Sequence, residues 1–424
     1  MHYRPPPLVP VNPASTVIPS KTVITVVALT TLAQIGTVMG IAVFPVIAPK
    51  LAVELGVEAS LIGYQMSLIY GVAAISSPFL TWMVTRFGAC RAIQAGLLLS
   101  VFALALALLS GIAALVAASI LLGAAMSVMT PAGAHILFRF SPPKHRNLVF
   151  SIKQTCVPAG WMVMALVAPP VTLLFGWKWA IALVVLFAVV MIFALQGVRA
   201  TWDDDRSAQA GSVRQQAREG MILLWRFPQL RWLSVASTFM SGVQLCLSSF
   251  AVTLLVQEAG YGLVAAGVML SVAQGAGVAG RIAWGWIADR FGNCLGLLIK
   301  MSAVMVVCCL MMALVTPQWP RLLTALLFLV FGASAIGWNG LFLAEVARLS
   351  PQGKVSVATS GAMVWNFAGI LIGPALFALI YRMNSSYTFT FGLLSLFAIG
   401  GFVFLLLTAA SARRVAAGLG VSRD

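Results

Sequence analysis

Residues 286–294 read WIADRFGNC and residues 82–90 read WMVTRFGAC, so five of nine positions are identical at an offset of 204. Each copy lies where a long apolar run ends at a basic residue, Arg290 in one and Arg86 in the other. A shorter echo pairs FRFSP at 138–142 with ARLSP at 347–351, at an offset of 209. The chain is therefore predicted to contain one structural unit twice.

Apolar runs follow one another along almost the whole sequence, which is 61% hydrophobic and 8% charged, with a mean hydropathy of +1.01. A helix needs about 20 apolar residues to cross a bilayer core. Reading the runs against their Gly, Pro and charged breakers gives twelve candidates. They lie near 22–48, 60–84, 92–110, 112–138, 147–174, 177–198, 232–256, 263–288, 295–315, 321–344, 355–381 and 388–410. We predict an all-α membrane protein of twelve transmembrane helices in two pseudo-symmetric six-helix bundles.

The predicted bundles span residues 22–198 and 232–411, and a polar linker, 199–231, joins them. The Pro-rich residues 1–21 are expected to form a disordered cytoplasmic tail. They do not resemble a cleavable signal peptide, because the first apolar run lacks a cleavage site of small residues. Residues 412–424 are expected to form a second cytoplasmic tail. Parallel half-repeats are typical of secondary transporters, which bind substrate between their halves.

The distribution of Lys and Arg sets the orientation. With both termini in the cytoplasm, nineteen of these residues fall into the inner segments, and the outer segments hold only Lys50, Lys178, Arg321 and Arg382. This is the pattern of the positive-inside rule. The net charge of +16 follows from it and does not indicate a nucleic-acid partner.

The sequence shows no evident pattern of residues that would bind a metal ion or catalyse a reaction. The six cysteines lie in or beside apolar spans without a metal-type CxxC pair, which favours small buried side chains. We find no nucleophile–base constellation or phosphate loop. The chain is therefore predicted to be no enzyme, to need no cofactor or metal, and to act as a monomer in the lipid bilayer.

Two cations lie deep within predicted spans. Arg281 precedes Asp289 by eight residues, roughly 12 Å along a helix, and Lys153 follows Arg146 by seven. None of the ten acidic residues falls at mid-membrane depth. A buried unpaired cation costs at least about 2.5–3.5 kcal/mol, so such residues normally face a watery cavity. We predict that Arg281 and Lys153 bind a small anionic substrate; snorkelling of Lys153 and helix bridging by Arg281 are the alternatives.

Polar side chains at similar depth extend this predicted substrate site. Gln274 shares a helix face with Arg281, and Thr359 shares one with Asn366. Hydrogen bonding between helices would explain such residues equally well. The other candidates inside predicted spans are Gln34, Gln154, Gln244, Trp338 and Asn339.

Charges at the cytoplasmic ends of spans are expected to form a gate. Glu345 has Arg348 three residues on, with Arg290 and Lys354 expected nearby, and such a latch would favour the outward-facing state when closed. Glu345 and His135 are also candidate proton sites, although His135 could simply be a hydrogen-bonded helix residue. The predicted gating residues are Asp289, Arg290, Glu345, Arg348 and Arg86.

The repeated motif resembles the signature of the major facilitator superfamily, a Gly followed by Asp-Arg-x-Gly and a further basic residue. Residues 285–292, GWIADRFG, fit it well. In the first copy Thr81 replaces the glycine and Thr85 the aspartate, while Arg86, Gly88 and Arg91 remain. The resemblance covers residues 22–410 and implies the twelve-span fold of that superfamily.

Two longer strings look like its bacterial cyanate-permease-like and organic-anion branches: RNLVFSIKQTCVPAG at 146–160 and GWNGLFLAEVAR at 337–348. Residues 281–289, RIAWGWIAD, are also similar to the eighth span of monocarboxylate transporters, where the Arg contacts the substrate carboxylate. Our leading hypothesis is a proton-coupled or exchanging carrier of a small organic anion, a mono- or dicarboxylate, in a bacterial inner membrane. The resemblance by itself does not choose among carboxylates, cyanate-like inorganic anions and larger acids. A proton-coupled exporter of drugs or amphiphiles and a non-transporting membrane receptor are the rival hypotheses.

Overall fold

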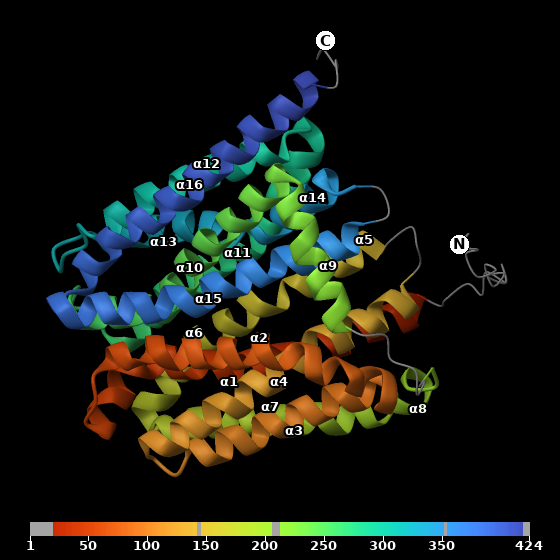
Figure 1. The fold of residues 1–424 in the computed structure, drawn as a ribbon. Helices are drawn as coiled ribbons and strands as arrows, with labels where there is room; N and C mark the ends of the chain where they lie inside the picture. Colours follow the sequence, from red (N-terminus) through yellow and green to blue (C-terminus); the bar gives the residue numbers. More distant parts are fainter. Residues whose placement is uncertain (1–19, 142–145, 206–212, 352–353, 419–424) are drawn as a thin grey trace.

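The computed structural model describes residues 20–141, 146–205, 213–351 and 354–418, and these residues fold almost entirely as helices (Figure 1). Residues 1–19 and 419–424 of the two predicted tails lie outside the described residues, whereas residues 412–418 continue the last helix of the chain. In hydrocarbon every backbone N–H and C=O must bond within the protein, and helices meet that requirement within each segment.

The first half of the chain forms one helical bundle. Its elements are α1 (Ser20–Leu55), the short 3₁₀ helix η1 (Ala59–Leu61), α2 (Ile62–Phe87), α3 (Ala89–Ala107), α4 (Ile112–Phe140), α5 (Arg146–Gln154), α6 (Cys156–Phe175) and α7 (Trp177–Gln196). Within it α1 packs on α4, α6 and α7, and α3 packs on α4 and α7.

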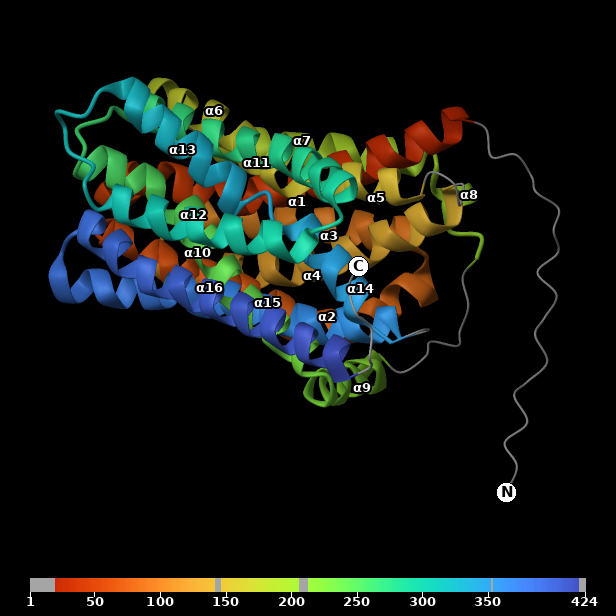
Figure 2. The ribbon, with the colours of Figure 1, turned by 90° about the horizontal axis from the view of Figure 1, so that it is seen from above.

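The second half forms a similar bundle. Its elements are α10 (Pro228–Gln257), α11 (Leu263–Phe291), α12 (Cys294–Met312), α13 (Arg321–Ala335), α14 (Asn339–Leu349), α15 (Val355–Asn384) and α16 (Tyr387–Gly418). Here α10 packs on α15 and α16, and α11 packs on α13. Two short helices, α8 (Arg199–Trp202) and α9 (Val213–Arg226), lie between the halves in sequence, and we call the end of the molecule where they lie the linker end (Figure 2).

Twelve segments of the described residues are long and apolar enough to span a membrane, which confirms the predicted number. Ser110, with φ of 58°, and Gly111 separate α3 from α4, as the sequence suggested. Two spans are interrupted in a way the sequence analysis did not anticipate. The fifth breaks at Thr155, between α5 and α6, and the tenth breaks at 336–338, between α13 and α14.

The repeated motif owes its glycines to backbone geometry. Gly88 and Gly292, its equivalent in the second copy, have φ of 101° and 60°, a region that side chains disfavour. Each turns the chain from one span into the next. At Gly88 a Cβ would also overlap the side chain of Asp203. The two positions where the copies keep glycine are therefore positions that require it.

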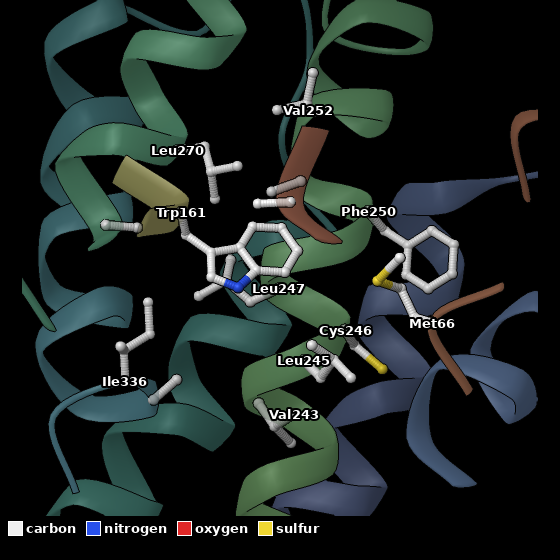
Figure 3. Packing of buried hydrophobic residues seen from close by; sticks show 14 of the residues in the cluster. Met66, Trp161, Val243, Leu245, Cys246, Leu247, Phe250, Val252, Leu270 and Ile336 are labelled. Carbon is white, nitrogen blue, oxygen red and sulfur yellow. The ribbon is translucent and has the colours of Figure 1, made fainter. Parts of the chain in front are cut away.

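The two bundles pack most closely away from the linker end. A single cluster of buried apolar residues runs through both, and Figure 3 shows Trp161 of α6 among Leu247 of α10 and Leu270 of α11. Gly63 of α2 lies against the Pro374 carbonyl, and Gly267 of α11 lies against the Ala165 carbonyl. These backbone approaches close the interface at the end opposite the linker.

The predicted linker makes contacts with both bundles. Asp203 accepts hydrogen bonds from the backbone N–H groups of Cys90 (2.7 Å) and Arg91 (3.1 Å), so it caps the first turn of α3. Asp204 and Asp205 both pair with Arg139 at the end of α4. Helix α9, by contrast, packs mainly on α15. Residues 199–205 are thus attached to the first bundle and α9 to the second.

Candidate functional site

Lys153 lies at the end of α5, 7% exposed, and its ammonium points into the first bundle. It donates to the side-chain carbonyl of Gln34 on α1. The amide nitrogen of Gln34 in turn approaches Thr130 Oγ1 of α4 at 3.4 Å. A Cβ at Gly133 would lie 3.1 Å from Lys153 Nζ, so the lysine occupies space that a glycine leaves open. Lys153 is therefore held inside the bundle rather than extended toward its end.

Arg281 of α11 joins the two bundles. Its Nε donates to the backbone carbonyl of Ile336 at 3.1 Å, within the break of the tenth span. Its Nη1 donates to the backbone carbonyl of Gln154, at the break of the fifth span in the other bundle. One guanidinium thus binds both helix interruptions.

These two carbonyls are available because the helices are interrupted. Pro158, four residues after Gln154, has no N–H with which to close the usual helical bond. Ile336 follows the last residue of α13, and α14 begins only at Asn339, whose amide also approaches the Ile336 carbonyl at 3.5 Å. Carbonyls at the ends of broken helices attract cations in membrane carriers. Here they attract an arginine.

Neither of the two basic side chains has a carboxylate partner among the described residues. Their hydrogen-bond partners are an amide and two carbonyls, which carry no net charge. Among the described residues, no Asp or Glu forms an ion pair with Lys153 or Arg281. Both lie within electrostatic range of the buried Cys156 thiol, at the start of α6. The break of the fifth span therefore brings the two predicted cations to one region.

The second bundle contributes an amide network beside this region. Gln244 of α10 accepts from Trp338 Nε1 at 3.1 Å and from Asn339 Nδ2 at 3.0 Å. Gln274 of α11, which is buried, donates to Ser248 Oγ at 3.0 Å. The structure thus connects four of the predicted candidates by hydrogen bonds within one bundle.

The remaining substrate-site candidates are more scattered. Asn366 of α15 is buried, its backbone carbonyl accepts from Ser241 Oγ at 2.8 Å, and its Nδ2 has no partner among the described residues. Thr359, two turns earlier on α15, is half-buried, and the side chain of Gln154 is exposed. Only the backbone carbonyl of Gln154, not its amide, reaches Arg281.

Within the part of the chain that the structure describes, the ion pairs do not join the predicted gating residues into one latch. Glu345 is fully buried and pairs with Arg348 of its own helix, at 2.8 Å from Nε. Asp289 and Arg290 are exposed at the end of α11, where Arg290 lies over the Trp286 ring. Arg86 is exposed at the end of α2 beside Phe87.

His135 pairs with Asp205 and with neither of the two cations among the described residues. Its Nε2 is 2.7 Å from Asp205 Oδ2, and its side chain is 40% exposed. It therefore joins α4 to the segment that follows the sixth span.

An apolar cavity of about 230 Å³ occurs elsewhere, between α1, α2 and α4 at the end opposite the linker. Its lining includes Glu58, Tyr64 and Gln65 but neither Lys153 nor Arg281. We therefore do not assign it to the candidate site.

The predicted substrate site did not include Thr130, Gly133, Pro158 or Ser248, although each contacts or shapes the site. Thr130 precedes a proline inside a span, and Pro158 lies inside a span, so both were visible as helix-perturbing positions. Which carbonyl a proline frees can be counted from the sequence. Which cation binds that carbonyl depends on how the bundles pack.

Two MFS-type transporters are similar in sequence to part of this chain. It is 24% identical over 231 residues to an uncharacterised MFS-type transporter of one Mycobacterium tuberculosis strain, covering 53% of this chain and 49% of the relative. It is 26% identical over 176 residues to another such transporter from a second strain, covering 40% and 37%. The chain thus spans about half the length, or less, of these curated relatives.

Solved structures share the fold. A variant of the peptide transporter POT superimposes with a TM-score of 0.74 at 15% identity, covering 93% of this chain and 95% of that one. POT in complex with sulfate gives a TM-score of 0.73 at 16% identity, with the same coverage. At this identity the likeness concerns the fold alone. The family model of the Major Facilitator Superfamily matches residues 30–374, and the chain belongs to that superfamily.

Proposed function

We propose that this protein is a secondary active transporter that carries a small organic anion, a mono- or dicarboxylate, by alternating access. The observation that carries the proposal is the pair Lys153 and Arg281, two buried or half-buried cations within spans whose partners are uncharged. A cation in the membrane without a carboxylate is costly, and a bound anion offsets that cost. Coupling is to protons or to exchange of a second anion.

The chemistry of the two cations suits a carboxylate. Arg281 uses Nε and Nη1 for backbone carbonyls, and its remaining N–H groups can donate to a carboxylate. Lys153 supplies a point charge from the opposite bundle. The amides of Gln244, Asn339 and Asn366 would hold the polar remainder of the substrate.

Binding would also change the contact between bundles. A carboxylate forms a stronger, charge-assisted hydrogen bond with a guanidinium than a backbone carbonyl does. A substrate carboxylate at Arg281 would therefore compete with the Gln154 carbonyl, which is one of the contacts that tie α11 to the first bundle. A ligand shifts a conformational equilibrium only if it binds one conformation more tightly than the other. The competition at Arg281 would favour the conformation in which Arg281 has released the Gln154 carbonyl.

The sequence supports the proposed branch and the proposed location. The two strings that resemble cyanate-permease-like and organic-anion carriers contain Lys153, Pro158, Trp338 and Asn339, which are residues of this site. The excess of Lys and Arg supports a cytoplasmic linker end and cytoplasmic termini in a bacterial inner membrane. The close packing at the opposite end then corresponds to a carrier closed on its outer side.

The test is uptake of labelled mono- and dicarboxylates into proteoliposomes. Arg281→Gln and Lys153→Gln should each raise the apparent KM at least tenfold, because each removes one charge from the site. Lys300→Gln is the matched control, because Lys300 is exposed near the start of α12 and should leave uptake unchanged. Wild-type kinetics in both site variants would refute the assignment. Efflux of cationic dyes that survives both substitutions would instead support the exporter hypothesis.

A further inference from the structure

Helix α9 runs across the spans rather than along them, on the outside of α15 and near α2 (Figures 1 and 2). Its Leu224 is buried, whereas Ile222 and Trp225 are 55% and 59% exposed. Residues three apart share one face of a helix. α9 therefore buries one apolar side in the protein and leaves a second apolar side uncovered.

An arginine stands beside this uncovered face, between two tryptophans. The guanidinium carbon of Arg231 lies 5.3 Å from the centre of the Trp225 ring and 4.4 Å from that of Trp232. Trp232 stacks on Phe404 of α16 with ring centres 5.6 Å apart, which fixes its orientation. The rings hold the arginine in place through its planar face.

The charge of Arg231 is not balanced within the part of the chain that the structure describes. No ion pair joins it to an Asp or Glu there, and its Nε is buried without a hydrogen-bond partner. Arg226, exposed at the end of α9, adds a second positive charge nearby. The only acid of α9 is Glu219, near the middle of the helix and twelve residues before Arg231.

The depth of this cluster matches a bilayer surface. Arg231 and Trp232 are the fourth and fifth residues of α10, which is long and apolar enough to span a membrane from its first residue, Pro228. Trp and Arg at the ends of spans lie at the level of lipid headgroups. An amphipathic helix that runs across the spans at this level places its apolar side against acyl chains.

We propose that Arg231, held between Trp225 and Trp232 and assisted by Arg226, binds the phosphate of an anionic phospholipid in the leaflet at the linker end. A guanidinium matches phosphate geometry with two parallel hydrogen bonds. The acyl chains of that lipid cover Ile222 and Trp225. A lipid with a zwitterionic headgroup binds Arg231 less tightly, because the cation of its own headgroup lies beside the phosphate. This site is separate from Lys153 and Arg281 and does not depend on the transported substrate.

The experiment measures lipid binding to the purified full-length protein in detergent, by native mass spectrometry and by thermal unfolding with added lipid. Wild type should bind phosphatidylglycerol about fivefold more tightly than phosphatidylcholine, the preference expected from one cation at the surface. Arg231→Met should abolish that preference. Trp225→Ala, which changes an exposed side chain and should fold normally, should reduce it. Lys178→Met is the control, because Lys178 lies beside Trp177 at the opposite end and should keep the preference.

Three results would overturn the proposal. Equal binding of the two lipids by wild type would show that no anionic headgroup is recognised. A full preference retained by both Arg231→Met and Trp225→Ala would place the lipid elsewhere. Equal stabilisation by inorganic phosphate at the same concentration would make this a site for soluble anions.

Discussion

Asp203 and Asp204, two adjacent carboxylates at the linker end, differ in the groups that they bind. Asp203 is buried and accepts two backbone N–H bonds at the first turn of α3, whereas Asp204, with a side chain 57% exposed, forms an ion pair with Arg139. Hydrogen bonds from an orphan helix terminus to a buried carboxylate are worth more than an exposed ion pair. Asp203 is therefore expected to contribute more to the stability of the fold than Asp204.

We expect Asp203→Ala to destabilise the folded protein by about 2 kcal/mol, because two amides of α3 lose their acceptor. Asp204→Ala should cost less than about 1 kcal/mol, since its ion pair is exposed to solvent. Denaturant unfolding in detergent, followed by circular dichroism, measures both. Equal losses in the two variants would contradict the capping role.

Gln34 stabilises the buried ammonium of Lys153. Gln34→Leu should cost about 1–3 kcal/mol, because it leaves a buried charge without its hydrogen-bond acceptor. Adding Lys153→Met should recover part of that loss by removing the charge itself. Thermal unfolding of the two single variants and the double variant forms a cycle that isolates the pair. A double variant less stable than Gln34→Leu alone would show that Lys153 has another stabilising partner.

At the scale of elements, the interruption between α5 and α6 matters most. Pro158 leaves the Gln154 carbonyl without a helical donor, and Arg281 from the other bundle takes its place. A helix that crossed this point without interruption would present no acceptor there. The contact between bundles at the site therefore depends on a proline in one of them.

Pro158→Ala should lower the transport rate severalfold, because a new N–H at position 158 competes with Arg281 for the Gln154 carbonyl. The fold should be preserved or gain stability, since alanine favours a continuous helix. Initial rates in proteoliposomes measure the effect, with Pro170→Ala as a control farther along α6. Unchanged rates for Pro158→Ala would mean that the released carbonyl plays no part in the cycle.

The sequence predicted the spans better than the points at which two of the spans are interrupted. Apolar length and glycine or charge breakers gave all twelve spans, and Ser110-Gly111 divided two of them correctly. The breaks at Thr155 and at 336–338 were missed because each is short and the apolar length of the whole span still suffices to cross a membrane. Lys153 and Arg281 were found as cations at depth. Their partners were not, since Gln34 is 119 residues from Lys153 and Gln154 is 127 residues from Arg281 in sequence.

At the scale of the whole molecule, closure at the end opposite the linker depends on backbone contacts. Gly267 of α11 approaches the Ala165 carbonyl of α6, and a Cβ there would also lie 2.8 Å from Pro169 Cγ. The Ala165 carbonyl is part of the backbone, so it cannot move aside as the end of a flexible side chain can. Small residues at such interfaces allow helices of different bundles to meet.

Gly267→Ala should therefore shift the population toward conformations open at that end. Distances between spin labels on the two bundles, measured by electron paramagnetic resonance, should lengthen at the end opposite the linker. Gly262→Ala is the control, because a Cβ at Gly262 meets nothing within 4 Å. An unchanged distance distribution in Gly267→Ala would show that the interface adapts without opening.

The cap that Asp203 places on α3 also determines where this polypeptide can be divided. The first bundle is complete only when the chain has been made to Asp205, seven residues beyond the boundary at 198 that hydropathy suggests. A gene split after codon 205 should yield two pieces that reassemble into a working carrier when produced together. A split after codon 198 would separate Asp203 from the piece that contains α3, so the first backbone N–H groups of α3 would lose their acceptor. These two pieces should not reassemble into a working carrier.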